Sequence, residues 1–146
     1  MARDPFVEEV AGAVQASVRL LVQRLRQTQA VEGEPTSSET SAMARLDRTG
    51  PTTSAELARL ERISPQSMGA TVAALEERGL VGRAADPDDG RRSILSLTEE
   101  GRALLQRRRS ARSELLSNAL ESEFTRAELK QLQIAAPLIE RLAEHL

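Results

Sequence analysis

The 146-residue chain contains no cysteine, no tryptophan and no tyrosine, and its single histidine is His145. The lack of cysteine excludes disulfides, thiolate metal sites and cysteine redox sensing. With one histidine, no nucleophile–base set and no glycine-rich phosphate loop, the sequence offers little from which an enzyme active site could be built. We therefore expect no catalytic residues, no metal site and no cofactor, and we expect His145 to lie on the surface.

Aromatic residues and long apolar runs are also scarce. Phe6 and Phe124 are the only aromatics, so the core must be built from Leu, Val, Ile, Met and Ala, and a ligand pocket would lack aromatic walls. No apolar run reaches the roughly 18 residues that a membrane span needs. The start of the chain lacks the apolar centre of a secretory signal. We expect a soluble, cytoplasmic protein with no membrane partner.

The chain is close to electrically neutral, with 20 basic and 22 acidic residues and a net charge of −2. Many nucleic-acid binders are strongly basic, so any affinity for DNA must rest on a few well-placed groups. Lys130 is the only lysine, and every other basic residue is arginine. The planar fork of arginine suits phosphate and carboxylate recognition, although a GC-rich genome also favours this residue.

Long helices are predicted at both ends of the chain, over 5–30, 99–121 and 126–145. In the first of them apolar residues recur at steps of three and four, which gives one stripe at helical period. Pro137 is predicted to kink the last helix or to remove one of its hydrogen bonds. The apolar stripe of the first helix consists of Val7, Val10, Val14, Val18, Leu21 and Leu25. A shorter helix is predicted over about 37–48.

Between these helices, 53–79 has the pattern of two short helices joined by a tight turn. The turn at 62–64 contains Ile63, which we expect to be buried, and the second helix covers about 65–78. Gly79 supplies its stop. The inward side of this second helix is predicted to consist of Met68, Val72 and Leu75. Residues suited to cap the helices of the chain precede each of them: Asp4, Thr36, Thr53 or Ser54, Ser64, Thr98 and Thr125.

The outward face of the helix 65–78 is small and polar near its N-terminus, as entry into the major groove of DNA requires. Gln66 is the best base-reading candidate, because its amide can pair with adenine N6 and N7. The helix N-terminus favours phosphate. An ordinary amphipathic helix with a bland surface is the alternative. The candidate DNA contacts here are Ser64, Pro65, Gln66, Ser67, Ala70 and Thr71, with Thr53 and Ser54 on the DNA backbone.

Two extended runs, 80–86 and 92–98, follow, and the Pro, Asp and Gly between them indicate a hairpin. Arg91 and Arg92 lie at its tip, where arginine can enter a minor groove or grip phosphates. A solvated charged turn would contain the same residues, but the preceding helix-turn-helix favours DNA contact. Two acidic side chains are candidates for orienting the guanidinium groups: Asp88 and Asp89.

These features together resemble the MarR family of bacterial winged-helix regulators. The residues that carry the resemblance are 54–58, 75–81, Arg83, 86–92 and 97–101. The resemblance implies a mainly α (α+β) fold in a single domain, 1–146. A winged helix-turn-helix with a two-stranded wing would occupy 36–98, and N- and C-terminal dimerisation helices would occupy 5–34 and 99–146. It also implies an obligate homodimer with a wing arginine in the minor groove.

Two departures from the family pattern matter for this chain. The absence of cysteine sets it apart from the peroxide-sensing branch. Gly90 stands between the acidic pair and the arginine pair, which leaves open whether Arg91 or Arg92 occupies the tip of the wing.

A dimer is also predicted from the residues themselves, because the terminal helices carry more apolar surface than a small winged-helix core can cover. Burial against a second copy is the economical solution. Two-fold symmetry would place the two recognition helices about one DNA turn apart, ~34 Å, and would suit an inverted repeat.

The stretch 101–113 holds five arginines and no acidic residue. A solvated helix face is the simplest interpretation. Alternatively, the stretch supplements phosphate contacts, or, by resemblance, borders a cleft for a small anionic or apolar effector. The candidate residues for that cleft are Arg102, Arg107 and Arg108.

The sequence therefore predicts a transcriptional regulator with double-stranded DNA and a second copy of itself as partners, usually a repressor in this family. Its expected location is the bacterial cytoplasm, on the nucleoid when bound. The alternative is a winged-helix protein–protein adaptor, which would tolerate charge reversal at Arg91 and Arg92.

Overall fold

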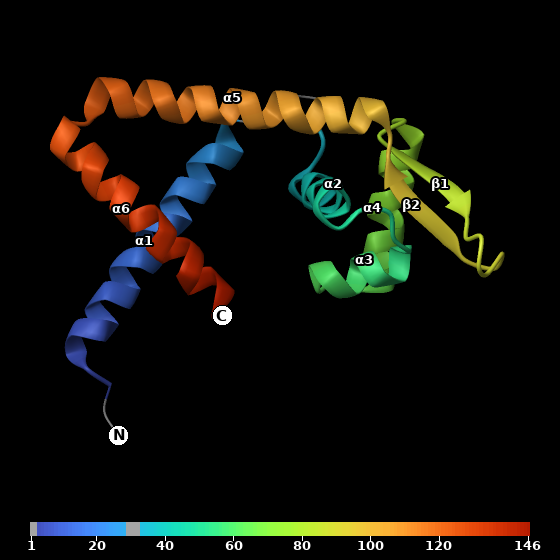
Figure 1. Ribbon diagram of the computed structural model, residues 1–146, viewed down its shortest axis with the longest axis horizontal. Coiled ribbons are helices and arrows are strands. Elements are labelled where there is room, and N and C mark those ends of the chain that lie inside the picture. The colour runs from blue at the N-terminus through green and yellow to red at the C-terminus, as the bar shows by residue number, and fades with distance from the viewer. Residues whose placement is uncertain (1–2, 29–32) are drawn as a thin grey trace. The chain divides into compact units, whose positions relative to one another are not determined.

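The computed structural model describes residues 3–28 and 33–146, in which six helices and two strands follow one another. The helices are α1 (Pro5–Gln27), α2 (Ser37–Thr49), α3 (Ser54–Glu61), α4 (Pro65–Glu77), α5 (Glu99–Glu123) and α6 (Arg126–Glu144), and the strands are β1 (Val81–Ala85) and β2 (Ser93–Leu97). The chain divides into two compact units, Met1–Leu105 and Gln106–Leu146, and α5 runs from one into the other (Figure 1). The predicted winged helix-turn-helix with a mainly helical fold is confirmed.

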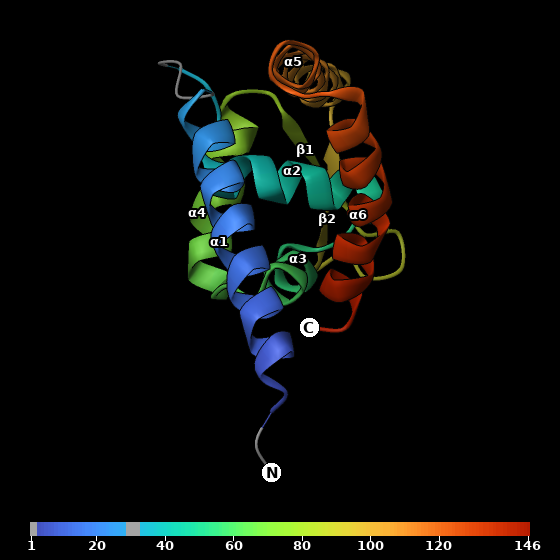
Figure 2. The same ribbon diagram turned by 90° about the vertical axis from the view of Figure 1, so that its left-hand side faces the viewer.

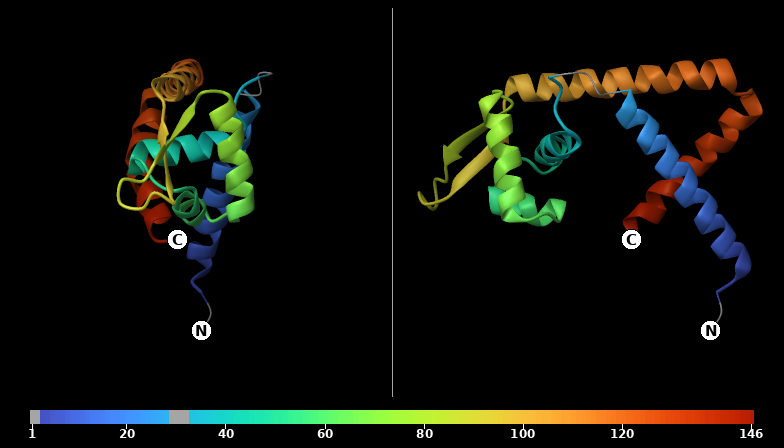
Figure 3. Two further views of the ribbon diagram at one scale, coloured as in Figure 1. Left: turned by 90° about the vertical axis from the view of Figure 1, so that its right-hand side faces the viewer. Right: turned by 180° about the vertical axis from the view of Figure 1, so that it is seen from behind.

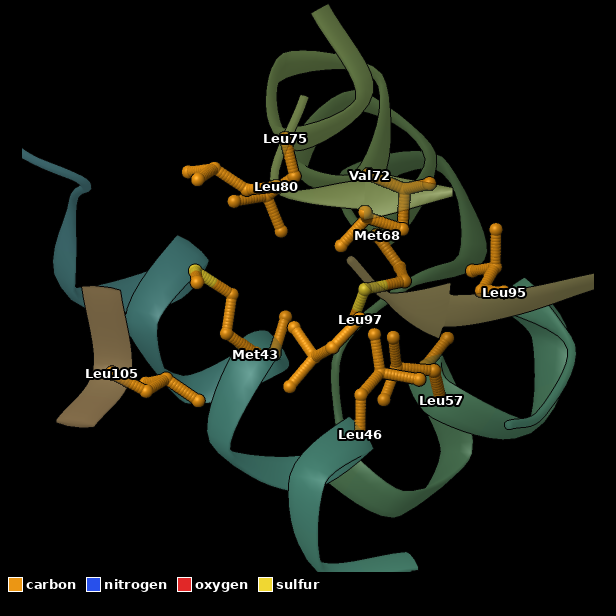
Figure 4. Packing of buried hydrophobic residues seen from close by; sticks show 13 residues of the cluster. Met43, Leu46, Leu57, Met68, Val72, Leu75, Leu80, Leu95, Leu97 and Leu105 are labelled. Atoms are coloured by element: carbon orange, nitrogen blue, oxygen red, sulfur yellow. The ribbon is translucent and has the colours of Figure 1, made fainter. Parts of the chain in front are cut away.

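The core of the first unit lies among α2, α3, α4 and the β-hairpin (Figure 4). Its side chains are aliphatic or methionine, as the composition requires, and Phe6 and Phe124 both lie exposed. The predicted inward side of α4 is confirmed. The buried residues are Ala42, Met43, Leu46, Leu57, Ala58, Met68, Val72, Leu75, Leu80, Val81, Leu95, Leu97 and Leu105.

The predicted caps are also confirmed, since a side-chain oxygen accepts a backbone N–H at the start of every described helix. Thr36 with Glu39 and Thr125 with Glu128 form complete capping boxes. The hydrogen bonds from the backbone and hydroxyl of Thr125 hold the pKa of Glu128 below its ordinary value. Each such cap contributes about 1 kcal/mol to helix stability.

The prediction that Ile63 is buried is wrong. Its side chain is 38% exposed, because Arg62 ends α3 in the left-handed conformation with φ of 55°. This geometry lets the N–H of Ile63 donate to the carbonyl of Ala58 over 3.1 Å, which closes the helix end and turns the isoleucine outward.

Other differences from the predicted elements are small. α1 ends at Gln27 rather than 30, and residues 29–30 of that prediction lie outside the described residues. α6 ends at Glu144 rather than 145, and it continues through Pro137 as predicted. The hairpin has an additional partner that was not predicted, because Thr52 and Leu95 exchange two backbone hydrogen bonds of 3.1 and 2.7 Å. This bridge fastens the segment before α3 to β2.

A small polar cluster joins α2 to the end of α3. Ser41 Oγ and Arg45 Nε each donate to the carboxylate of Glu61 over 2.6 Å. Burial would raise the pKa of Glu61, but these hydrogen bonds, with the charges of Arg45 and Arg48, hold it below its ordinary value. Glu61 is therefore ionised at neutral pH and holds the two helices together.

The second unit consists of the later part of α5 and the whole of α6. The chain changes direction between these two helices at Phe124 and Thr125 (Figure 2). No residue of α6 is buried, and the same is true of α1 in the first unit. Both helices carry large apolar side chains that face solvent in a single chain. They include Val7, Val10, Leu20 and Leu21 in α1, and Leu132, Ile134, Leu138, Ile139 and Leu142 in α6.

The start of α5 packs directly on the chain reversal that follows α4. The Thr98 hydroxyl donates to the carbonyl of Gly79 over 2.7 Å and accepts the N–H of Gly101 over 3.0 Å. A Cβ on Gly101 would lie 2.2 Å from the carbonyl oxygen of Leu80 and 3.2 Å from a methyl of Leu97. Gly101 is thus required by the close approach of two backbone segments.

Two glycine-to-alanine changes in helices should therefore have opposite effects. Gly101→Ala should destabilise the protein by about 2–3 kcal/mol, because backbone must move to admit the methyl group. Gly69→Ala in α4, where no atom lies within 4 Å of the added Cβ, should stabilise it by about 0.5–1 kcal/mol. Urea unfolding at one fixed protein concentration measures both. Equal effects of the two substitutions would contradict the packing described here.

Candidate nucleic-acid interface

The helix-turn-helix is formed by α3 and α4, and the packing of one side of α4 decides which residues it presents. With Met68, Val72 and Leu75 in the core, the opposite side presents Gln66, Ala70 and Ala73, all exposed. α4 contains no arginine and no lysine. No other residue in the described part of the chain hydrogen-bonds the amide of Gln66. This face is therefore narrow and uncharged near its start, with one amide available for a ligand.

The first turn of α4 is organised by its two serines. Ser64 Oγ accepts the N–H of Ser67 over 3.1 Å and donates to Ser67 Oγ over 2.9 Å. Pro65 occupies the first helical position, where its missing N–H costs nothing. Ser64, Pro65, Gln66 and Ser67 are all exposed, so the predicted candidates of this turn lie together on the surface.

Thr71 and the start of α3 are less free than the sequence suggests. The Thr71 hydroxyl donates to the carbonyl of Ser67 over 3.1 Å, which leaves only its oxygen lone pairs for a ligand. Thr53 Oγ1 accepts the N–H of Glu56 as the cap of α3. Thr53 and Ser54 are both half-buried, so a contact with a phosphate would use their backbone and hydroxyl edges.

The wing is a tight loop at the free end of the β1–β2 hairpin (Figure 3). Its backbone closes through hydrogen bonds from the N–H of Asp86 to the carbonyl of Arg92 and from the N–H of Arg92 to the carbonyl of Asp89, each of 3.0 Å. The carboxylate of Asp89 accepts the backbone N–H of Arg91 over 3.1 Å. Asp89 therefore shapes the backbone of the loop, and within the described residues neither Asp88 nor Asp89 forms an ion pair with an arginine. That one of them orients a guanidinium stays a prediction.

Arg91 and Arg92 are exposed, and within residues 3–28 and 33–146 neither makes an ion pair. By contrast, Arg83 of β1 donates to Glu76 of α4 over 2.6 Å. This hydrogen bond raises the pKa of Arg83 and ties the hairpin to the recognition helix. Arg83 was identified only through the family resemblance, and its structural role is this link.

The arginines predicted to line an effector cleft all lie on α5. Arg102 belongs to the first unit and Arg107 and Arg108 to the second; Arg102 and Arg107 are exposed and Arg108 is half-buried. A cavity of about 570 Å³ lies elsewhere in the second unit, between α5 and α6. It is lined by Leu120, Arg126, Leu129, Lys130, Leu132, Gln133 and Ala136.

Among the described residues, no group of three or more His, Asp or Glu side chains is arranged to hold a metal ion. None of the described helices is both long and apolar enough to cross a membrane.

Comparison with known proteins agrees with this geometry. The sequence model of the MarR family matches residues 36–93, from the cap of α2 to the first residue of β2. An HTH-type transcriptional regulator of Mycobacterium tuberculosis is 37% identical over 107 residues, which make up 73% of this chain and 74% of that protein.

Among solved structures, a putative transcriptional regulator of Pseudomonas aeruginosa superposes with a TM-score of 0.85 at 29% identity, over 97% of this chain and 98% of that one. A mutant of MepR from Staphylococcus aureus, bound to an oligodeoxyribonucleotide, superposes with a TM-score of 0.69 over 94% of this chain and 98% of that one. At 19% identity, this second likeness is one of fold.

Proposed function

Because the chain belongs to the MarR family of transcriptional regulators, we propose that it binds double-stranded DNA through α4 and the wing. It is a regulator and not an enzyme. In the proposed mechanism it acts as a repressor, since a protein bound across a promoter excludes the polymerase. It works in the bacterial cytoplasm, on the nucleoid when bound.

The observation that carries the proposal is the exposed face of α4, where Gln66 lies beside small residues. The two wing arginines of the same unit make no ion pair with any described residue. The small side chains let the helix backbone approach the floor of the major groove. Gln66 pairs with adenine N6 and N7, and Ser64 and Ser67 bind a phosphate or a base edge. Arg91 and Arg92 reach the adjacent minor groove or its phosphates.

The active form is a homodimer in this proposal. Large apolar side chains of α1 and α6 stay exposed to solvent in a single chain; Leu21 and Leu138, for example, are 50% and 51% exposed. A second copy offers the same two faces and would bury them. Two recognition helices about one DNA turn apart, ~34 Å, then read an inverted repeat.

A small anionic or apolar effector is proposed to release the DNA by changing the separation of the two recognition helices. A differential affinity of roughly 1–3 kcal/mol between the free and DNA-bound forms is sufficient. Arg102 and Arg107, which are exposed on α5, are the candidate residues for binding an anion, with Arg108 beside them.

Selection of bound sequences from a random DNA pool tests the function directly. The wild-type protein should enrich an inverted repeat. Gln66→Ala should then lose about 1–3 kcal/mol of discrimination at one adenine in each half-site, because it removes a bidentate base contact, while discrimination at the other positions is kept. Repeating the selection with the variant measures this. No enrichment by the wild type would refute DNA reading and favour the adaptor alternative.

Replacing Arg91 and Arg92 together by alanine should flatten the salt dependence of DNA binding. Each lost arginine–phosphate contact reduces the steepness of the slope of log K against log salt by about 0.9. A dimer that loses one or two such contacts in each copy should therefore show a slope that is less steep by about 2 to 4. Anisotropy titrations at several salt concentrations measure the slope. Arg59→Ala, which breaks an ion pair within α3, is the control. Unchanged binding after reversing both wing charges to glutamate would argue for an adaptor.

Leu21→Arg in α1 or Leu138→Arg in α6 should yield monomers, since either change places an unpaired charge in the proposed interface. Binding to the full repeat should fall to that of a single half-site. Sedimentation at micromolar concentration measures the mass, and Gln23→Arg, on the opposite side of α1, is the control that should remain dimeric. A wild-type protein that sediments as a monomer would contradict the dimer.

A further inference from the structure

Arg78, which follows the last residue of α4, contacts the first turn of α2 and the segment just before it. Its Nη1 donates to Glu39 Oε2 over 3.1 Å, and its Nη2 donates to the carbonyl of Gly33. Arg78 and Glu39 are 39 residues apart in the chain. Their side chains are only 34% and 13% exposed, so solvent screens this pair less than it screens an ordinary surface ion pair.

Glu39 is held in place independently of Arg78. Its carboxylate accepts the backbone N–H of Thr36 over 3.1 Å, and its own N–H donates to Thr36 Oγ1 over 3.2 Å. Arg78 therefore binds a fixed point at the start of α2 rather than a freely rotating side chain. The contact therefore restrains where the C-terminal end of α4 lies relative to the start of α2.

The same end of α4 is fastened from a second side by the start of α5. The carbonyl of Gly79 accepts the Thr98 hydroxyl, and the carbonyl of Leu80 lies against Gly101. The C-terminal end of α4 is thus joined both to α5 and, through Arg78, to the start of α2. Gln66, at the other end of the helix, is exposed.

The length of α4 makes its direction important. Its 13 residues span about 20 Å at about 1.5 Å per residue, so a tilt of about 6° at the C-terminal end moves the N-terminal end by about 2 Å. Hydrogen bonds to base edges weaken steeply with such displacements. A residue that holds the C-terminal end therefore helps to set, together with the packing of Met68, Val72 and Leu75 in the core, what the N-terminal end can reach.

We propose that Arg78 is a positioning residue for DNA binding. By joining α4 to the start of α2, it fixes the direction of the recognition helix and so the spacing between half-sites that the dimer accepts. This inference rests on the proposed function, because spacing matters only when two copies bind one DNA molecule. Arg78 acts through Glu39 and Gly33 and does not itself touch DNA.

The test compares the affinity of the full-length protein for its selected inverted repeat and for the same repeat with one base pair inserted between the half-sites. The insertion separates them by about 3.4 Å and rotates one by about 35°, so the wild type should prefer the selected spacing. Arg78→Ala should reduce this preference by about 3- to 30-fold, because its recognition helices can tilt to follow either spacing. Arg78→Lys keeps the charge beside Glu39 and should restore part of the preference.

Glu39→Gln is the second variant. Glutamine can still close the capping box but loses the charge that pairs with Arg78. It should reduce the preference as Arg78→Ala does, and the double variant should be no worse than either single one if the two residues act as one link. Arg59→Ala removes an arginine that pairs with Glu56 within α3, and it should leave the preference unchanged.

The inference is overturned if Arg78→Ala weakens binding to both repeats by the same factor, or if it binds both as the wild type does. Thermal unfolding in the same buffer shows whether a uniform loss reflects unfolded protein. Failure of the proposed function looks different, since the wild type would then enrich no inverted repeat at all.

Discussion

The carbonyl groups that follow α4 hold the first turn of α5, and the parts of the first unit that are proposed to meet DNA depend on this contact. Gly79 and Leu80 present their carbonyls to Thr98 and Gly101, and the N–H of Thr98 donates to the carbonyl of Leu80 over 3.2 Å. The strands of the wing lie between these two segments, so the contact closes the base of the hairpin as well. The end of α4, the base of the β-hairpin and the start of α5 therefore meet at one contact.

Two groups of arginines in the first unit differ in their electrostatic partners. Arg45, Arg78 and Arg83 are paired with carboxylates on other elements, where they hold helices and strands together. Arg91 and Arg92 have no such partner in the described residues. A chain with a net charge of −2 has little long-range attraction for a polyanion. In the proposed complex, attraction then comes from the unpaired arginines, and pairing two copies doubles their number.

Sequence reasoning identified the helices and the inward side of α4, because burial on one face of a helix makes apolar residues recur at helical period. It identified the hairpin and the caps from residue types that favour turns and helix starts. The same periodicity predicted that the candidate DNA-contacting residues of α4 share one exposed face. The prediction for Ile63 fails because its exposure is decided by the left-handed backbone of Arg62, a conformation that a non-glycine residue rarely adopts. The hydrogen bond from the N–H of Arg91 to Asp89 depends on the backbone of the folded loop, which the sequence pattern does not specify. The Arg78–Glu39 pair joins positions whose proximity exists only in the folded chain.

Shape and charge in the wing are carried by different residues. The loop is closed by backbone hydrogen bonds and by the carboxylates of Asp86 and Asp89, which accept the N–H groups of Asp88 and Arg91. The side chains of the two arginines take no part in that closure. A single substitution at either arginine can therefore change what the loop attracts and leave its fold intact.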